Sequence, residues 1–102
     1  MTKYDVIISP EAERLMANCV LFLAEQDLNA GLSLKVRLIE SIGNLDHLPA
    51  RYPFFNESYI PANKYHKMFV ENWYLILYQI KDNVVYIDYV LDCRQDYQWL
   101  IH

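Results

Sequence analysis

The sequence predicts an α+β domain: a short N-terminal strand, an antiparallel helical hairpin, a three-stranded antiparallel meander and a short C-terminal tail. Two changes of pattern lead to this prediction. Between residues 10 and 48 apolar residues recur at spacings of three and four, which is typical of one face of a helix. After residue 64 the pattern changes to the two-residue period of strands, and short polar gaps between the strand-like segments favour hairpins.

The composition fits one folded domain that covers residues 1–102. Hydrophobic residues make up 54% of the chain, which is far above the level of disordered segments. No apolar segment approaches the ~20 residues that a membrane-spanning helix needs, and the N-terminus lacks the pattern of a signal peptide. We therefore expect a cytoplasmic protein with no membrane partner.

A strand followed by two helices is predicted for the first half of the chain. The β-branched segment 4–8 ends at Ser9 and Pro10, where serine can cap a helix and proline suits the first helical position. Asp27 or Asn29 can cap a second helix after a short break. The two helices are predicted at residues 10–25 and 28–48. The short break makes them an antiparallel hairpin.

The second half is predicted to contain a loop and three strands. Prolines and asparagines make residues 49–63 a loop, and its aromatic residues can anchor it to the surface. The strands are predicted at residues 65–70, 74–80 and 84–91. In the middle strand both faces carry apolar side chains, so something must cover each face of the sheet. The cover for the second face is either the loop or the tail, or else a docked partner.

The charge of the chain argues against binding to nucleic acid through a general basic surface. The formal net charge is -4 and the isoelectric point is near 5.2, so any such role depends on a local patch. The densest basic cluster is formed by Lys64, His66 and Lys67. His66 could transfer protons near neutral pH, and either lysine could hold a phosphate. The alternative is that these are solvated charges along a strand.

A second candidate cluster follows the last strand. Arg94 is followed by Asp96 and Tyr97, and its guanidinium could grip a phosphate or stabilise charge on a transferring phosphoryl group. Arg94 could equally pair with Asp96 and fix the tail. We expect Trp99 and Ile101 to dock on the domain, because exposing them would leave a large apolar area in water.

The residues that commonly hold metals or cofactors do not form a recognisable pattern. Cys19 and Cys93 are the only cysteines, and their spacing fits neither a disulfide framework nor a zinc site. No nucleophile motif, glycine-rich phosphate loop or paired-carboxylate site stands out. We therefore expect no metal and no organic cofactor, and most enzyme classes are unsupported.

Taken together, the segment YDVIISPEAE, the helical hairpin and the segment YHKMFVENWYLILYQIKDNVVYIDYVLDCRQDY resemble the RelE/ParE superfamily of toxins from bacterial type II toxin–antitoxin modules. The likeness covers nearly the whole chain. It implies a plasmid-stabilisation type of module, in which a cognate antitoxin neutralises the toxin and forms a hetero-oligomer with it. Antitoxins of this kind combine a DNA-binding domain with a disordered tail that folds on the toxin.

The resemblance implies two possible targets, because the superfamily divides by mechanism. RelE-like members cleave mRNA in the ribosomal A site, whereas ParE-like members poison DNA gyrase and are not nucleases. On the nuclease pattern, His66 falls near the basic site of the first meander strand and Arg94 on the arginine after the last strand. The catalytic set of a nuclease would then be His66, Lys67, Arg94 and Tyr97. Contacts to a phosphate or a target would come from Lys64, Arg94 and Asp96.

Two departures from the nuclease pattern favour the ParE-like branch. Asp96 stands where one nuclease branch has a histidine, and Leu75 stands where the nucleases carry an arginine on the middle meander strand. Losing a fixed cation from a phosphoryl-transfer site commonly costs a few kcal/mol of transition-state stabilisation. The resemblance therefore implies a growth-inhibiting toxin with a protein target such as DNA gyrase. The alternatives are a ribosome-dependent mRNA endoribonuclease and an inactive relative that only binds an antitoxin, and the antitoxin-binding residues stay unidentified.

Overall fold

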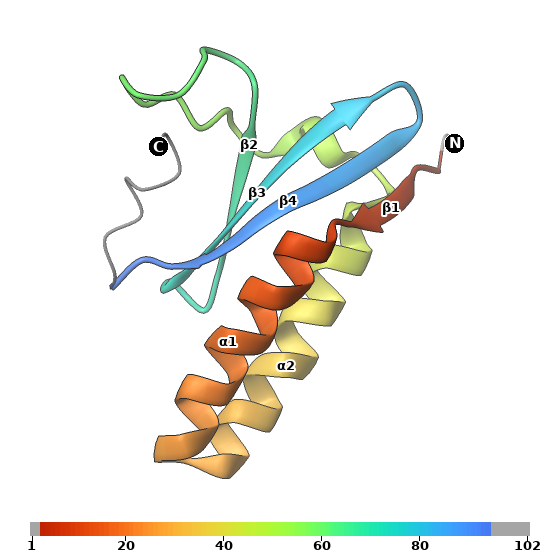
Figure 1. Ribbon diagram of the computed structural model, residues 1–102. Helices are drawn as coiled ribbons and strands as arrows, with labels where there is room; N and C mark the ends of the chain where they lie inside the picture. Colours follow the sequence, from red (N-terminus) through yellow and green to blue (C-terminus); the bar gives the residue numbers. More distant parts are fainter. Residues whose placement is uncertain (1–2, 95–102) are drawn as a thin grey trace.

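The computed structural model describes residues 3–94, which form a helical hairpin packed on one face of a four-stranded sheet (Figure 1). The helices are α1 (Pro10–Gln26) and α2 (Leu28–Gly43), and the strands are β1 (Asp5–Ile8), β2 (His66–Val70), β3 (Tyr74–Lys81) and β4 (Val84–Asp92). Short 3-10 turns cover Asn44–Asp46 and Pro49–Arg51. The predicted α+β fold is confirmed.

The sheet has the order β1-β4-β3-β2 and is mixed. β2, β3 and β4 form the predicted antiparallel meander. β1 pairs with β4 in parallel, with Asp5 opposite Val84 and Ile8 opposite Ile87. A parallel pair needs a long crossover connection, and the helical hairpin supplies part of it. β1 and β2 are therefore the two edges of the sheet.

The two helices begin at the caps that the sequence indicates. The Ser9 hydroxyl accepts the backbone N–H of Ala12 at 3.0 Å, and Pro10 follows it at the first helical position. Of the two candidate caps for α2, Asp27 is the one used, because its carboxylate accepts the N–H of Ala30 at 3.1 Å. These bonds satisfy N–H groups that have no partner inside the helix.

α2 ends at Gly43, five residues before the predicted end at residue 48. The chain continues as a 3-10 turn that holds Leu45 fully buried, so the apolar spacing continues although the α-helix has stopped. The carbonyl of Asp46 then accepts the N–H of Tyr4, and Leu48 takes a left-handed backbone conformation with φ of 49°. The apolar spacing after Gly43 therefore reflects burial of Leu45 in the core and not a continuation of the α-helix.

Both faces of the sheet are covered. On the first face the helical hairpin packs on the sheet. The core between them includes Leu38 and Ile42 of α2 and Ile76, Tyr78 and Ile87 of the sheet. On the second face a separate cluster joins Phe55 and Ile60 of the loop to Leu75, Leu77 and Leu91. Of the alternatives that the sequence left open, the structure shows the loop as a cover for the second face.

The loop is tied to the sheet along the free side of β2. Backbone bonds join Phe55 to Tyr65 at 2.7 Å and Lys67 to Pro53 at 2.9 Å. The Tyr78 hydroxyl, which is buried, donates to the carbonyl of Pro49 at 2.6 Å. Through these contacts the loop protects part of an edge strand from pairing with another chain. Within residues 3–94, neither helix is long and apolar enough to cross a bilayer.

Candidate functional site

Arg94 lies just beyond β4 and is held by Asp92. Its Nε donates to Asp92 Oδ1 at 2.9 Å and its Nη2 donates to Asp92 Oδ2 at 2.7 Å, which is a two-bond fork. The backbone N–H of Arg94 also donates to Asp92 Oδ1, at 3.0 Å. Nη2 makes a further bond to the Tyr74 hydroxyl at 3.1 Å. The arginine is therefore fixed in direction by its own strand end.

Asp92 and Arg94 form an ion pair that shifts the pKa values of both side chains. The Asp92 side chain is only 6% exposed, whereas that of Arg94 is 43% exposed. Hydrogen bonds from Arg94 hold the pKa of Asp92 below its usual value, although burial opposes this effect. The same bonds raise the pKa of Arg94. The cation is therefore permanent, but the face of its fork is already occupied by a carboxylate.

An open pocket of about 450 Å³ lies beside Arg94, between α2 and the β2–β3 turn. Leu23 and Leu34 contribute apolar walls, and Trp73 borders the pocket with its indole about half exposed. The Arg94 guanidinium carbon lies 5.8 Å from the ring centroids of both Trp73 and Tyr74. At this distance a cation is attracted to the faces of aromatic rings.

The same pocket contains a second ion pair. Arg37 of α2 reaches across to Glu71 in the β2–β3 turn at 2.9 Å. Glu71 and Asn72 both have positive φ, at 54° and 64°, which is uncommon outside glycine. A second open hollow of about 430 Å³ shares Ser33 and Arg37 and continues along α2. The two hollows are therefore neighbours on either side of Ser33 and Arg37.

His66 is far from this pocket and is buried on the helix-covered face. Its Nδ1 lies 2.8 Å from the carbonyl of Tyr52, and since a carbonyl only accepts, Nδ1 carries a proton. The ring stacks on Tyr78 with centroids 5.3 Å apart, and Phe54 packs on it at 4.3 Å. His66 is only 8% exposed. It is a structural contact between the loop and the sheet.

The predicted basic cluster is not one site. His66 faces the helix-covered core, so Lys67, its neighbour on β2, projects from the opposite face. The Lys64 ammonium lies 5.3 Å from the ring centroid of Tyr65, which belongs to the second-face cluster. Strand alternation therefore separates the imidazole of His66 from Lys67, and the ammonium of Lys64 lies over the ring of Tyr65.

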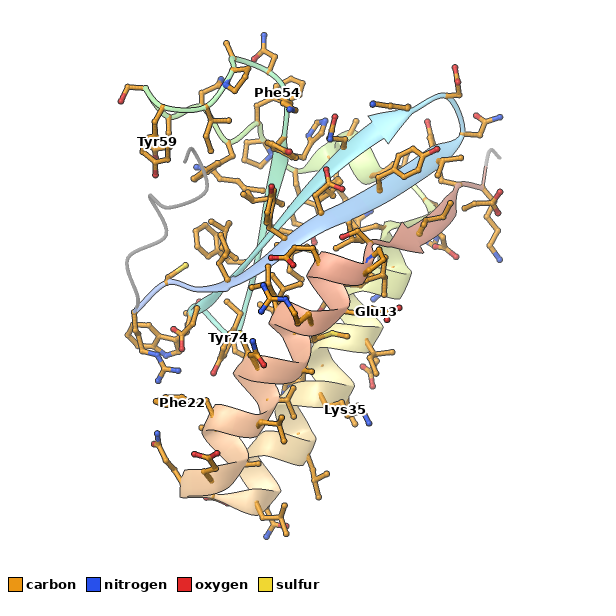
Figure 2. All side chains as sticks on the ribbon, in the orientation of Figure 1. Glu13, Phe22, Lys35, Phe54, Tyr59 and Tyr74 are labelled. Carbon is orange, nitrogen blue, oxygen red and sulfur yellow. The ribbon has the colours of Figure 1, made fainter. Side chains whose placement is uncertain are left out.

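The structure does not bring His66 and Arg94 together. His66 pairs with Tyr78 in the sheet, whereas Arg94 bonds Tyr74, and four residues along β3 correspond to about 13 Å. Figure 2 shows this separation, with Tyr74 where the sheet meets the helical hairpin and Phe54, which packs on His66, at the other end of the sheet. One phosphate cannot touch both residues.

Three further observations complete the comparison with the sequence. Leu75, at the position where the nucleases carry an arginine, is fully buried in the second-face cluster. Asp96 and Tyr97 lie outside the described residues, as does the predicted docking of the tail. Among residues 3–94, no group of three or more histidine, cysteine or acidic side chains could hold a metal ion.

Sequence reasoning missed Asp92, Arg37 and Glu71. Asp92 lies at the end of β4, two residues before Arg94. This spacing could have predicted that Arg94 pairs with Asp92 and not with Asp96. The Arg37–Glu71 pair had no such signal, because it joins a helix to a distant turn. Only packing of α2 on the sheet places these two residues together.

The comparisons with known proteins agree with this architecture. No protein-family model matches the chain, and no curated protein matches it. A solved structure described as a chromosomal ParDE TA system from P. aeruginosa does match, with a TM-score of 0.74 over 90% of this chain and 98% of that chain. The sequence identity is 8%. The chain therefore has the fold of a chain from a ParDE toxin–antitoxin system.

Proposed function

We propose that this chain is the toxin of a type II toxin–antitoxin module, of the ParE-like branch. On this proposal it acts in the cytoplasm as a single domain and stops growth by binding a protein target such as DNA gyrase. The fold likeness to a chain of a ParDE system, which covers nearly all of both chains, supports a place in such a module. The order of helices and strands and the mixed sheet support it as well.

The observation that carries the choice of branch is the state of Arg94. Its fork is closed by Asp92, and it lies about 13 Å along the sheet from the position of His66. A nuclease that uses the 2′-hydroxyl needs a base, an acid and a cation around one phosphate. Leu75 adds a fully buried apolar side chain at the position where the nucleases carry an arginine. These features support a role in protein binding over the alternative of mRNA cleavage.

The partner on this proposal is a cognate antitoxin that buries apolar surface of the toxin. Large apolar side chains are exposed on the hairpin and support this part of the proposal. They include Leu21, Phe22, Leu28, Leu32, Val36 and Ile39, each about half exposed or more. Soluble chains rarely leave such surface uncovered without a partner.

Two assays on the purified chain test the proposal side by side: DNA supercoiling by gyrase, and mRNA cleavage on programmed ribosomes read by toeprinting. We expect inhibition of supercoiling and an intact message. Arg94→Ala should leave the message intact as well. Codon-linked cleavage by the unmodified chain, abolished in Arg94→Ala while circular dichroism stays native, would establish the nuclease alternative. Growth without inhibition and no effect in either assay would identify an inactive relative.

A further inference from the structure

A β-bulge in β4 directs two consecutive side chains to the second face of the sheet. Leu77 of β3 pairs with Tyr89 of β4. The next residue of β3, Tyr78, pairs with Ile87, so Asp88 is an extra residue between these two pairs. Tyr89 belongs to the second-face cluster, and Asp88 contacts residues of the same face. Bulges commonly lie where a strand re-aims a side chain for a function.

The Asp88 carboxylate lies among hydrogen-bonding groups of that face. Its Oδ2 accepts a bond from Gln79 Nε2 at 2.6 Å. Burial raises the pKa of Tyr65 to about 12, and the charge of the nearby Asp88 carboxylate adds to this shift. The ring of Tyr65 meets the ring of Tyr89 edge to face, with centroids 6.0 Å apart. We refer to Tyr65, Gln79, Asp88 and Tyr89 as the Asp88 cluster.

The Asp88 cluster contains a carboxylate that has no counter-ion within residues 3–94. Asp88 is half-buried, and the ion pairs of this part of the chain do not include it. Lys67 projects from the same face, across Leu77 from Tyr89, and forms no ion pair with Asp88. Gln79 is a neutral donor, so it orients the carboxylate and leaves its charge in place. A half-buried charge without a counter-ion favours a cationic ligand.

The aromatic rings beside Asp88 fit a flat cation. The Lys64 ammonium lies 5.3 Å from the ring centroid of Tyr65, so this ring already attracts one cation of the chain itself. Tyr86, which is half-buried, pairs with Gln79 in the sheet and brings a further ring to the same face. A guanidinium stacks on aromatic rings and presents five N–H donors in one plane, whereas an ammonium is compact and strongly hydrated. A single carboxylate is too few ligands for Ca²⁺.

We propose that the Asp88 cluster binds an arginine side chain of a partner protein. The guanidinium donates to the Asp88 carboxylate and lies against the ring of Tyr89. The net charge of -4 on the whole chain attracts basic segments over a longer distance. The cluster shares no residue with the hydrogen bonds of Arg94. The proposal does not depend on the cellular target, so it stands apart from the proposed function.

The probe is acetyl-arginine methylamide, and the matched probe is the citrulline equivalent, which keeps the shape of the side chain without its charge. NMR titration of the full chain follows the side-chain amide of Gln79, which donates to Asp88. The arginine probe should bind about fivefold more tightly than the citrulline probe. Asp88→Asn should remove this difference. Lys64→Gln should increase it, because the competing ammonium over Tyr65 is gone.

Asp5→Asn is the matched control, because Asp5 is an exposed acid of β1 that pairs with Val84 and lies outside the cluster. It should leave the preference for arginine unchanged. Equal binding of the two probes, no shift with the arginine probe, or an equal loss in Asp5→Asn and Asp88→Asn would overturn the proposal. If circular dichroism shows that Asp88→Asn does not fold, the comparison of the two probes on the unmodified chain decides. A Gln79 shift caused by an RNA oligonucleotide and not by the arginine probe would overturn the proposal in favour of nucleic acid.

Discussion

The ion pair between Asp92 and Arg94 determines how much of the Arg94 guanidinium is available to a ligand. A free guanidinium at the end of the sheet would be available to a phosphate, but here two of its three nitrogens face a nearly buried carboxylate. Removing one partner of such a pair leaves the other charge poorly solvated. Asp92 is therefore expected to matter for the stability of the chain.

Asp92→Asn should lower the free energy of unfolding at pH 7 by about 1–3 kcal/mol, because bonds to a charged group are lost. The pKa of Asp92 is lowered in the folded chain, so its stabilisation is present above the ordinary aspartate range and disappears as the pH falls through the lowered pKa. Urea unfolding at several pH values should thus show the variant and the parent converging below about pH 4. Asp82→Asn, in an exposed turn, is the control and should change little.

Cys19 gives a second prediction at the scale of one residue. Burial raises the pKa of its thiol to about 11, with a smaller contribution from the charge of Asp92. In a Cys93→Ser variant, alkylation of Cys19 at pH 8 should be about a hundredfold slower than that of a free thiol. The difference should vanish in urea. Fast alkylation of the folded chain would mean that the thiol is not buried against the sheet.

At the scale of the secondary-structure elements, the helical hairpin is held at a close approach of its two helices. α1 and α2 are connected through Asp27 alone and pack side by side (Figure 1). The close approach depends on Gly31, since a Cβ built there would lie 2.5 Å from the Cβ of Ala24 and 2.8 Å from its Cα. The obstacle is partly backbone, so the helices themselves must separate to admit a methyl group.

Gly31→Ala should therefore destabilise the chain by about 1–3 kcal/mol, in spite of the better helix propensity of alanine. Gly43→Ala is a matched control, because a Cβ at Gly43 would have nothing within 4 Å. It should be neutral or slightly stabilising, within about 1 kcal/mol. Thermal unfolding followed by circular dichroism measures both. Equal effects of the two changes would show that the hairpin tolerates a wider spacing.

At the scale of the whole molecule, the sheet separates two apolar layers with different covers. Helices bury the first face, and the loop carries Phe55 and Ile60 onto the second. The second layer contains Leu75. This is the position at which the RelE-like nucleases carry an arginine on the middle strand of the meander. Leu75 itself is fully buried among apolar side chains, so a charged side chain at this position would have to leave water.

Leu75→Arg tests this directly. The substitution places a charge in a fully buried position without a partner carboxylate in the apolar cluster, so the free energy of unfolding should fall by about 3 kcal/mol or more. Leu75→Met keeps the volume and should cost less than about 1.5 kcal/mol. Chemical denaturation compares the two variants. A stable Leu75→Arg chain that cleaves ribosome-bound message would contradict the assignment of this face to the core.

The sequence by itself determined the order of the elements and most of their ends. Ser9, Pro10 and Asp27 mark the helix starts through bonds that reach only three residues along the chain. The two-residue period marks the meander in the same local way. Alternation on β2 also implied that His66 and Lys67 occupy opposite faces, although it did not say which face would be buried.

Only the tertiary structure decided the rest, because the deciding contacts join residues far apart in the sequence. Three features depend on how distant elements pack: the parallel pairing of β1 with β4, the loop over Leu75 and Leu77, and the hydrogen bond between His66 and the Tyr52 carbonyl. The meeting of Arg37 with Glu71, in the pocket beside Arg94, depends on it as well. Local patterns encode which residues are apolar or capping, whereas long-range packing selects which polar groups meet.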